Sequence, residues 1–165
     1  EKQDVLMMIN EIETKKKELF METFEEISKH FKSIFSQLFT KGSAYLKLED
    51  EENIFDGGLL IKVKLSGRKY LDIRSLSGGE KTLTAVSFLF AVQEFEPAFF
   101  YILDEVDAAL DKRNSERLAE LIRKYTKKAQ YIVISHNDGV ISEADNLYGV
   151  SMDNDGRSKV VSLRI

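Results

Sequence analysis

Apolar residues in the first 40 positions recur at alternating steps of four and three, and neither glycine nor proline interrupts them. This heptad spacing predicts a helix that buries one stripe against a partner helix. The stripe consists of Val5, Ile9 and Ile12, followed by Phe20, Phe24, Ile27, Phe31, Ile34 and Leu38. It weakens at Lys15–Lys17, where we expect a local irregularity. A helix of about 40 residues is about 60 Å long. Residues 1–40 are therefore predicted to form a coiled-coil helix whose partner strand lies outside this chain, with an amphipathic surface helix as the alternative.

From Lys41 onward the apolar positions alternate with a period of two. The segments near 44–48 and 59–65 are predicted to be strands, separated by a polar break at Asp56-Gly57-Gly58 and followed by a turn at Ser66-Gly67. We therefore expect a small antiparallel sheet in this region.

The rest of the chain alternates continuous apolar segments with helical patterns, which indicates buried strands in a parallel α/β sheet. Two further strands at the end flank Asn154-Asp155-Gly156, a strong signal for a hairpin turn. The predicted helices cover 79–95, 113–127 and 138–143, and the predicted apolar strands cover 99–103 and 131–134.

Composition excludes several classes of protein. The 165 residues fit one ordinary domain, and the absence of cysteine excludes disulfide frameworks, thiolate zinc sites and cysteine nucleophiles. No apolar run approaches the roughly 20 residues of a membrane helix, so we expect a soluble, cytoplasmic protein without a membrane partner. The chain begins at Glu1 within charged, helix-like sequence, and we expect it to be a fragment of a longer protein.

The net charge of −4 argues against a general electrostatic affinity for nucleic acid, although a local basic patch is compatible with it. Lys62 and Lys64 share one face of a predicted strand near Arg68 and Lys69. These four residues are candidate DNA contacts. A solvated sheet face is the alternative that we favour.

Two adjacent carboxylates, Asp104 and Glu105, follow the apolar strand at 99–103. Ligands bind at the carboxyl ends of strands in open α/β sheets. One carboxylate can hold a hydrated Mg²⁺ ion, and the next can accept a proton from an attacking water. The alternative is a solvated strand end with acids that cap a helix.

The segment Leu76-Ser77-Gly78-Gly79-Glu80-Lys81 precedes a predicted helix. A serine and two glycines there expose backbone N–H groups at a positive helix terminus, which suits a phosphate. A plain serine N-cap is the alternative. The G-x-x-x-x-G-K-[ST] spacing of a P-loop is absent from the sequence.

A histidine, His136, ends the second apolar strand within Val133-Ile134-Ser135-His136-Asn137. A histidine in this place can donate a hydrogen bond to a phosphate oxygen or orient a water. A purely structural histidine is the alternative.

In chain order, the three segments read LSGGEKTLTA, FYILDEVDAALD and VISHND. Together they resemble the ABC-type ATPase heads of the structural maintenance of chromosomes (SMC) family, specifically the C-terminal half of the head. The resemblance implies a neck coiled coil over 1–40. It implies over 41–165 the C-terminal lobe of an ABC-type P-loop NTPase head, an α/β fold with a parallel sheet, flanking helices and small antiparallel strands. The nearest rival is the SMC-like family of DNA double-strand-break repair ATPases, and a rival of another class is a non-catalytic coiled-coil adaptor.

The resemblance also implies a role for each matching residue. The signature motif, which contacts the γ-phosphate of ATP held by the opposite head, contains Ser77, Gly78, Gly79 and Glu80. Asp104 matches the Walker B aspartate that supports Mg²⁺, and Glu105 matches the glutamate that polarises the attacking water. The D-loop, which packs across the dimer, runs from Asp107 to Asp111, and the resemblance counts these two aspartates among the nucleotide-binding residues. His136 matches the switch histidine, although Ser135 departs from the threonine that precedes it in many SMC heads.

The implied function is that of half an ATPase. With an N-terminal half that carries the P-loop, such a chain binds ATP and Mg²⁺ and hydrolyses ATP when two heads engage, and it is inactive alone. In SMC proteins this cycle drives chromosome condensation, segregation and DNA entrapment. The implied location is cytoplasmic and nucleoid-associated, or nuclear and chromosomal in a eukaryote.

The implied partners are the N-terminal half, a second head, DNA and a kleisin subunit. The final hairpin, 145–165, is expected to pack one face on the head and to offer its edge or other face to the kleisin's winged-helix domain. The kleisin's N-terminal helices are expected at the neck, along the phenylalanine-rich stretch 20–39. The apolar residues of the hairpin are Tyr148, Val150 and Met152 on one strand, and Val161, Leu163 and Ile165 on the other.

Overall fold

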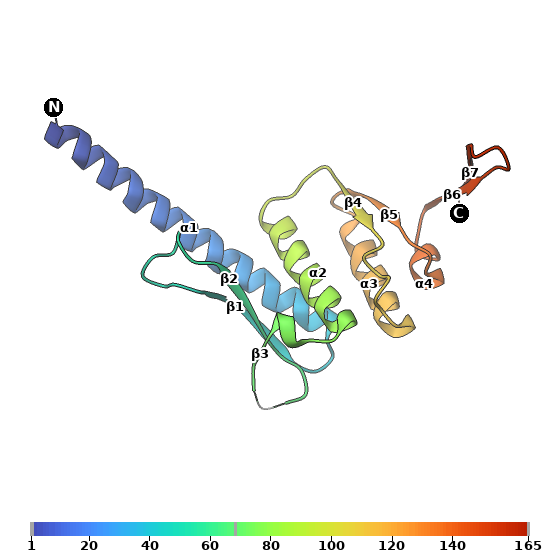
Figure 1. Cartoon of the computed structure of the whole chain (residues 1–165), viewed down its shortest axis with the longest axis horizontal. Helices are drawn as coiled ribbons and strands as arrows, with labels where there is room; N and C mark the ends of the chain where they lie inside the picture. The colour runs from blue at the N-terminus through green and yellow to red at the C-terminus, as the bar shows by residue number, and fades with distance from the viewer. Residues whose placement is uncertain (1, 68, 165) are drawn as a thin grey trace. The chain divides into compact units, whose positions relative to one another are not determined.

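The computed structural model describes residues 2–67 and 69–164. The chain forms two compact units, Glu1–Ala98 and Phe99–Ile165 (Figure 1). Among the described residues, no helix combines the length and the apolar character that crossing a bilayer requires. Three residues named above, Glu1, Arg68 and Ile165, lie outside the described part of the chain.

The first unit begins with the predicted long helix, α1 (Lys2–Leu38). Its last two turns pack against the second helix and the first strand, and they bury Phe31, Ile34, Phe35 and Leu38. The apolar positions nearer its start are exposed, among them Val5, Ile9, Ile12 and Leu19. Exposed apolar stripes of this kind are typical of interaction surfaces, so the upstream part of α1 fits a helix that is paired with another chain segment.

The predicted antiparallel sheet is confirmed by β1 (Ser43–Leu48), β2 (Leu59–Lys64) and β3 (Leu71–Asp72), in the order β1-β2-β3. Alternate side chains of β1 are buried, as the period of two requires. Gly42 enters β1 with φ 129°, and a Cβ built on it would lie 2.6 Å from the carbonyl oxygen of Lys64. Glycine is therefore required where α1 turns into the sheet.

The loop between β1 and β2 folds back onto α1. Ile54 is buried, and the ring of Phe55 meets that of Phe20 edge-on with centroids 5.5 Å apart. The ammonium of Lys16 lies 3.9 Å from the centroid of the Phe55 ring, a cation–π contact. The expectation of an irregularity at Lys15–Lys17 is wrong, because α1 is continuous there and the loop contacts it through Phe55.

The chain then passes through the short helix η1 (Ile73–Ser75) into α2 (Gly78–Phe95), which confirms the helix predicted over 79–95. Ser77 occupies the N-cap position of α2. Its backbone N–H donates to the Glu80 carboxylate over 3.0 Å. This is the returning bond of a capping box.

The second unit holds the predicted parallel pair, β4 (Phe100–Asp104) and β5 (Gln130–Ile134), joined by α3 (Lys112–Tyr125). The short helix α4 (Asp138–Ile141) follows β5. The expectation that both strands are buried is wrong in part. Leu103 is buried, but Phe100, Ile102, Ile132 and Ile134, which alternate along the other face, are exposed.

The final hairpin, β6 (Asn146–Met152) and β7 (Ser158–Arg164), is antiparallel as predicted. Leu163 lies opposite Leu147, and Val160 lies opposite Val150, so Leu163 and Val160 belong to opposite faces. Both faces are exposed. Within the described residues neither face is covered, and the expectation that one face packs on the head stays a prediction.

Candidate functional site

The strand β4 ends at Asp104, and Glu105 follows it in a left-handed conformation with φ 47°. Such a conformation costs a non-glycine residue about 1–2 kcal/mol. The backbone N–H of Glu105 donates to the carbonyl of Ile134, the last residue of β5, over 2.9 Å. The strained residue is thus held against the end of the neighbouring strand.

His136 and Glu105 meet at this edge of the sheet. The parallel register places Asp104 opposite Ile134, so the residues that follow both strands lie together (Figure 1). The Nε2 atom of His136 lies 2.9 Å from Oε1 of Glu105. Both side chains are accessible, with 84% of His136 and 52% of Glu105 exposed. The pair can therefore act on a ligand that approaches this edge.

Asp107 and Ser135 make a second contact between the same two segments. Asp107 is only 4% exposed, and its Oδ2 accepts a hydrogen bond of 2.6 Å from the hydroxyl of Ser135. The backbone N–H of Asn137 donates to that hydroxyl oxygen over 2.9 Å. This contact was not predicted, because Asp107 and Ser135 are far apart in the sequence and each is an ordinary loop residue.

Asp111 occupies the N-cap position of α3. Its carboxylate accepts a hydrogen bond of 2.9 Å from the backbone N–H of Asn114. The structure therefore gives this residue a capping role, which stabilises the start of the helix that follows the Asp107 segment.

In nucleotide sites, Mg²⁺ is bound by one or two carboxylates, and water and phosphate oxygens fill its other coordination positions. Asp104 is suited to supply such a carboxylate. Its side chain is exposed at the end of β4. Within residues 2–67 and 69–164, no cluster of three or more acidic or histidine side chains could hold a metal by itself.

The signature residues belong to the first unit. Ser77 and Gly78 are exposed at the start of α2, and Gly79 and Glu80 follow in its first turn. A cavity of about 390 Å³ is lined by Glu80 and by Ser75 and Leu76, which precede the helix, together with Ser66, Gly67 and Lys69. Of the four signature residues, only Glu80 contributes to this lining.

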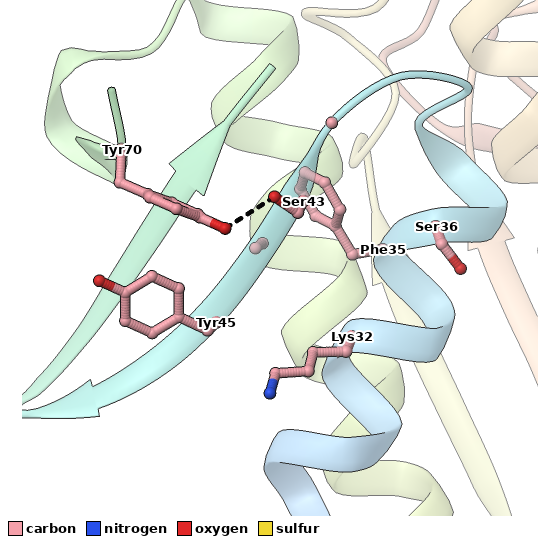
Figure 2. Close-up of a pocket in the computed structure, with 8 residues that line it drawn as sticks. Lys32, Phe35, Ser36, Ser43, Tyr45 and Tyr70 are labelled. Atoms are coloured by element: carbon pink, nitrogen blue, oxygen red, sulfur yellow. Dashed lines mark hydrogen bonds between the residues drawn. The ribbon is translucent and has the colours of Figure 1, made fainter. Parts of the chain in front are cut away.

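A second cavity of about 310 Å³ opens where α1 turns into β1 (Figure 2). Lys32 and Phe35 line it from α1, while Ser43 and Tyr45 line it from β1. The hydroxyls of Ser43 and Tyr70 are 2.9 Å apart. Its lining contains none of the residues predicted from the three motifs, so it is separate from the candidate site.

Comparison with known proteins matches residues 2–159 to the family described as the RecF/RecN/SMC N terminal domain. The chromosome partition protein Smc of Pyrococcus furiosus is 50% identical to this chain over 165 residues, which are 100% of this chain and 14% of that protein. The chain belongs to the SMC family. The corresponding proteins of Methanocaldococcus jannaschii and Bacillus subtilis are 48% and 40% identical, over 97% and 99% of this chain and 13% and 14% of theirs. This SMC chain therefore spans about one seventh of the length of these relatives.

Solved SMC heads share its α/β fold. The Smc head domain with an extended coiled coil from Pyrococcus furiosus, bound to the C-terminal domain of ScpA, matches with a TM-score of 0.90 and 50% identity, over 98% of this chain and 40% of that one. A structure from work on ATP-driven dimerization and DNA-stimulated activation of SMC ATPases matches with a TM-score of 0.81 and 50% identity, over 89% of each chain. These matches confirm the predicted SMC head fold.

Proposed function

We propose that this chain is the C-terminal half of an SMC ATPase head, and that it hydrolyses ATP once an N-terminal half supplies the P-loop and two heads engage. The observation that carries the proposal is the 2.9 Å contact between Glu105 and His136, beside Asp104 at the ends of β4 and β5. The ATP-driven dimerization described for a solved relative supports engagement in pairs.

Each residue of this edge has a distinct task in the proposal. Asp104 holds Mg²⁺, which neutralises charge on the phosphate oxygens when it is bound. Glu105 accepts a proton from the attacking water. His136 orients Glu105 through the contact of its Nε2 atom with the Glu105 carboxylate. Ser77, Gly78 and Gly79 offer the N-terminus of α2 to the phosphate of the opposite head.

The exposed face of β4 and β5 supports the division into halves. Phe100, Ile102, Ile132 and Ile134 form an apolar surface beside the catalytic edge. Apolar surfaces of this kind are usually covered by a partner. We propose that the N-terminal half covers this surface. In this division, residues 1–40 form the neck and residues 41–165 form the C-terminal lobe.

The proposal predicts that neither half turns over ATP alone and that the mixture does. The chain would be co-purified with the P-loop-bearing half, and phosphate release would be measured for each half and for the complex. A complex that forms but never hydrolyses ATP would favour the non-catalytic adaptor. Turnover by this chain alone would contradict the composite site.

The chromosomal role is proposed on the same basis, since the relatives are named chromosome partition proteins. We expect this role to consist of condensation, segregation and DNA entrapment at the nucleoid, and the similarity to chromosome partition proteins favours it over the role of a repair ATPase. The candidate DNA face on β2 is weakened by the structure. Lys62 pairs with Asp72 at 3.3 Å, and hydrogen bonds from Arg74 hold the pKa of the Asp72 carboxyl well below its usual range. The solvated sheet face is the better explanation of these lysines.

The kleisin contact is proposed at the final hairpin. Two solved relatives are SMC heads bound to C-terminal parts of ScpA. In this chain β6 and β7 expose apolar side chains on both faces. The second proposed contact, at the neck, is less supported, because the phenylalanines of α1 have partners within the unit. Phe31 is buried against Phe88, and Phe35 stacks on Phe39.

Replacing Leu163 with glutamate should weaken binding of the kleisin winged-helix domain at least about tenfold, because a charge at the centre of an apolar interface is expensive. Val160→Glu is the matched control. Val160 lies on the same strand with similar exposure, 60% against 62%, but on the opposite face. Pull-down with the isolated winged-helix domain measures both. Binding that survives disruption of the whole 145–165 hairpin would place the site elsewhere.

A further inference from the structure

The residues on both sides of His136 are held by side-chain hydrogen bonds. On one side, the hydroxyl of Ser135 donates to Asp107 over 2.6 Å. On the other side, the side-chain amide of Asn137 donates to the hydroxyl of Ser115 over 3.0 Å. Ser135 and Asn137 are also joined to each other, since the backbone N–H of Asn137 donates to the Ser135 hydroxyl over 2.9 Å. Three short bonds therefore fix the two neighbours of His136.

Two of the residues that anchor this network are buried in the second unit. Ser115 is fully buried in α3, and Asp107 is buried in the segment that follows Glu105. The side-chain oxygen of Asn137 accepts from the backbone N–H of Gly139 over 3.0 Å, which caps α4. A Cβ on Gly139 would lie 3.2 Å from that oxygen and 3.3 Å from Cγ of Glu116. The loop is therefore closely packed between α3 and α4.

His136 contrasts with its neighbours, because its side chain is largely exposed and reaches across to Glu105. The same two segments thus meet twice, through Glu105 and His136 at the surface and through Asp107 and Ser135 beneath. A buried hydroxyl–carboxylate bond is short and directional. The buried bond between Ser135 and Asp107 therefore restrains the distance between the two segments more tightly than the exposed contact between Glu105 and His136 does.

We propose that Ser135 is a positioning residue, which locks the His136 loop to the Glu105 segment through Asp107 and so presets the catalytic pair before nucleotide binds. The proposal rests on the proposed function of this site. Ser135 and Asp107 touch no reacting atom in it. Threonine at position 135 would keep the hydroxyl and hence the lock, whereas alanine would leave the buried Asp107 carboxylate without this donor.

The test compares steady-state ATP turnover by the assembled head, made of this chain and the P-loop-bearing half, in four variants. Ser135→Ala should lower kcat about tenfold or more with KM little changed, because a displacement of about 1 Å can cost a catalytic group up to about 100-fold. Ser135→Thr should stay within about twofold of wild type. Ser135→Cys has the same shape with a somewhat larger atom in place of the hydroxyl oxygen, and its thiol is only a weak donor, so it should lose several-fold in kcat. Ser142→Ala, the same change at an exposed serine after α4, should have no effect.

Glu105→Gln measured in the same assay separates the two proposals. If Glu105→Gln stops turnover while Ser135→Ala and Ser135→Cys keep the wild-type kcat, the positioning role is wrong and the proposed function stands. If Glu105→Gln leaves turnover unchanged, the proposed function itself is wrong. A loss in Ser135→Ala that Ser135→Thr does not restore would also overturn the role of the hydroxyl. Should Ser135→Ala fail to fold, the cysteine and threonine variants decide the matter.

Discussion

Replacing Glu105 with glutamine should reduce ATP turnover by the assembled head at least about 100-fold, the contribution expected of a general base. ATP binding and head engagement should survive, so ATP-bound dimers should accumulate. Glutamine has the same shape and can still hydrogen-bond His136, and it places no new demand on the left-handed backbone at this position. What it cannot do is accept the proton of the attacking water.

Phosphate release measures the loss of turnover. The fraction of dimer in the presence of ATP is measured by size exclusion with light scattering. Glu120→Gln is the matched control, because Glu120 is an exposed glutamate of α3 outside the site. Turnover near the wild-type level in Glu105→Gln would contradict the catalytic role of Glu105 and with it the proposed function. A variant that neither hydrolyses ATP nor forms dimers would instead point to a structural role in engagement.

The order and type of the elements could be predicted from the sequence because each has a distinct period. The heptad stripe gives α1, the period of two gives β1 and β2, and the continuous apolar runs give β4 and β5. Parallel pairing then brings Glu105 and His136 together, since residues after neighbouring parallel strands share one edge. Local pattern and topology were sufficient for this much of the site.

The contacts that the sequence did not reveal join residues without a periodic signal. Phe55 lies in a polar loop, and nothing in its neighbourhood indicates that the loop returns to Lys16 and Phe20. The Ser135–Asp107 bond spans 28 residues between two loops. Such contacts depend on the path of the chain in space.

The sequence also did not show which faces of the predicted strands are buried within this chain. Apolar strands predict a buried sheet, but burial depends on everything that covers the sheet, including segments outside this chain. One face of β4 and β5 and both faces of the β6–β7 hairpin are exposed although their sequences are apolar. The apolar pattern is typical of surfaces that are covered by a partner, and it carries no information on whether the cover belongs to the same chain.

Replacing Ser77 with arginine should abolish ATP-dependent dimerization of the assembled head while each single head still binds ATP. Ser77 is exposed at the N-cap of α2, where Gly78 and Gly79 leave room for a close approach by phosphate. A long cationic side chain fills that room. Loss of a serine cap costs about 0.5–2 kcal/mol, but the bond from the residue 77 backbone N–H to Glu80 does not depend on the side chain, so the helix should still form.

Dimerization is best measured in the Glu105→Gln background, where engaged heads accumulate, and ATP binding by single heads is measured with a fluorescent analogue. Ala85→Arg adds the same side chain at an exposed position two turns further along α2 and should leave both properties intact. If a single head that carries Ser77→Arg no longer binds ATP, the start of α2 contacts the nucleotide of its own head. A variant that binds ATP and still dimerizes like wild type would remove Ser77 from the engaged interface. Loss of dimerization alone is the result that requires the signature serine of one head to meet the nucleotide of the other.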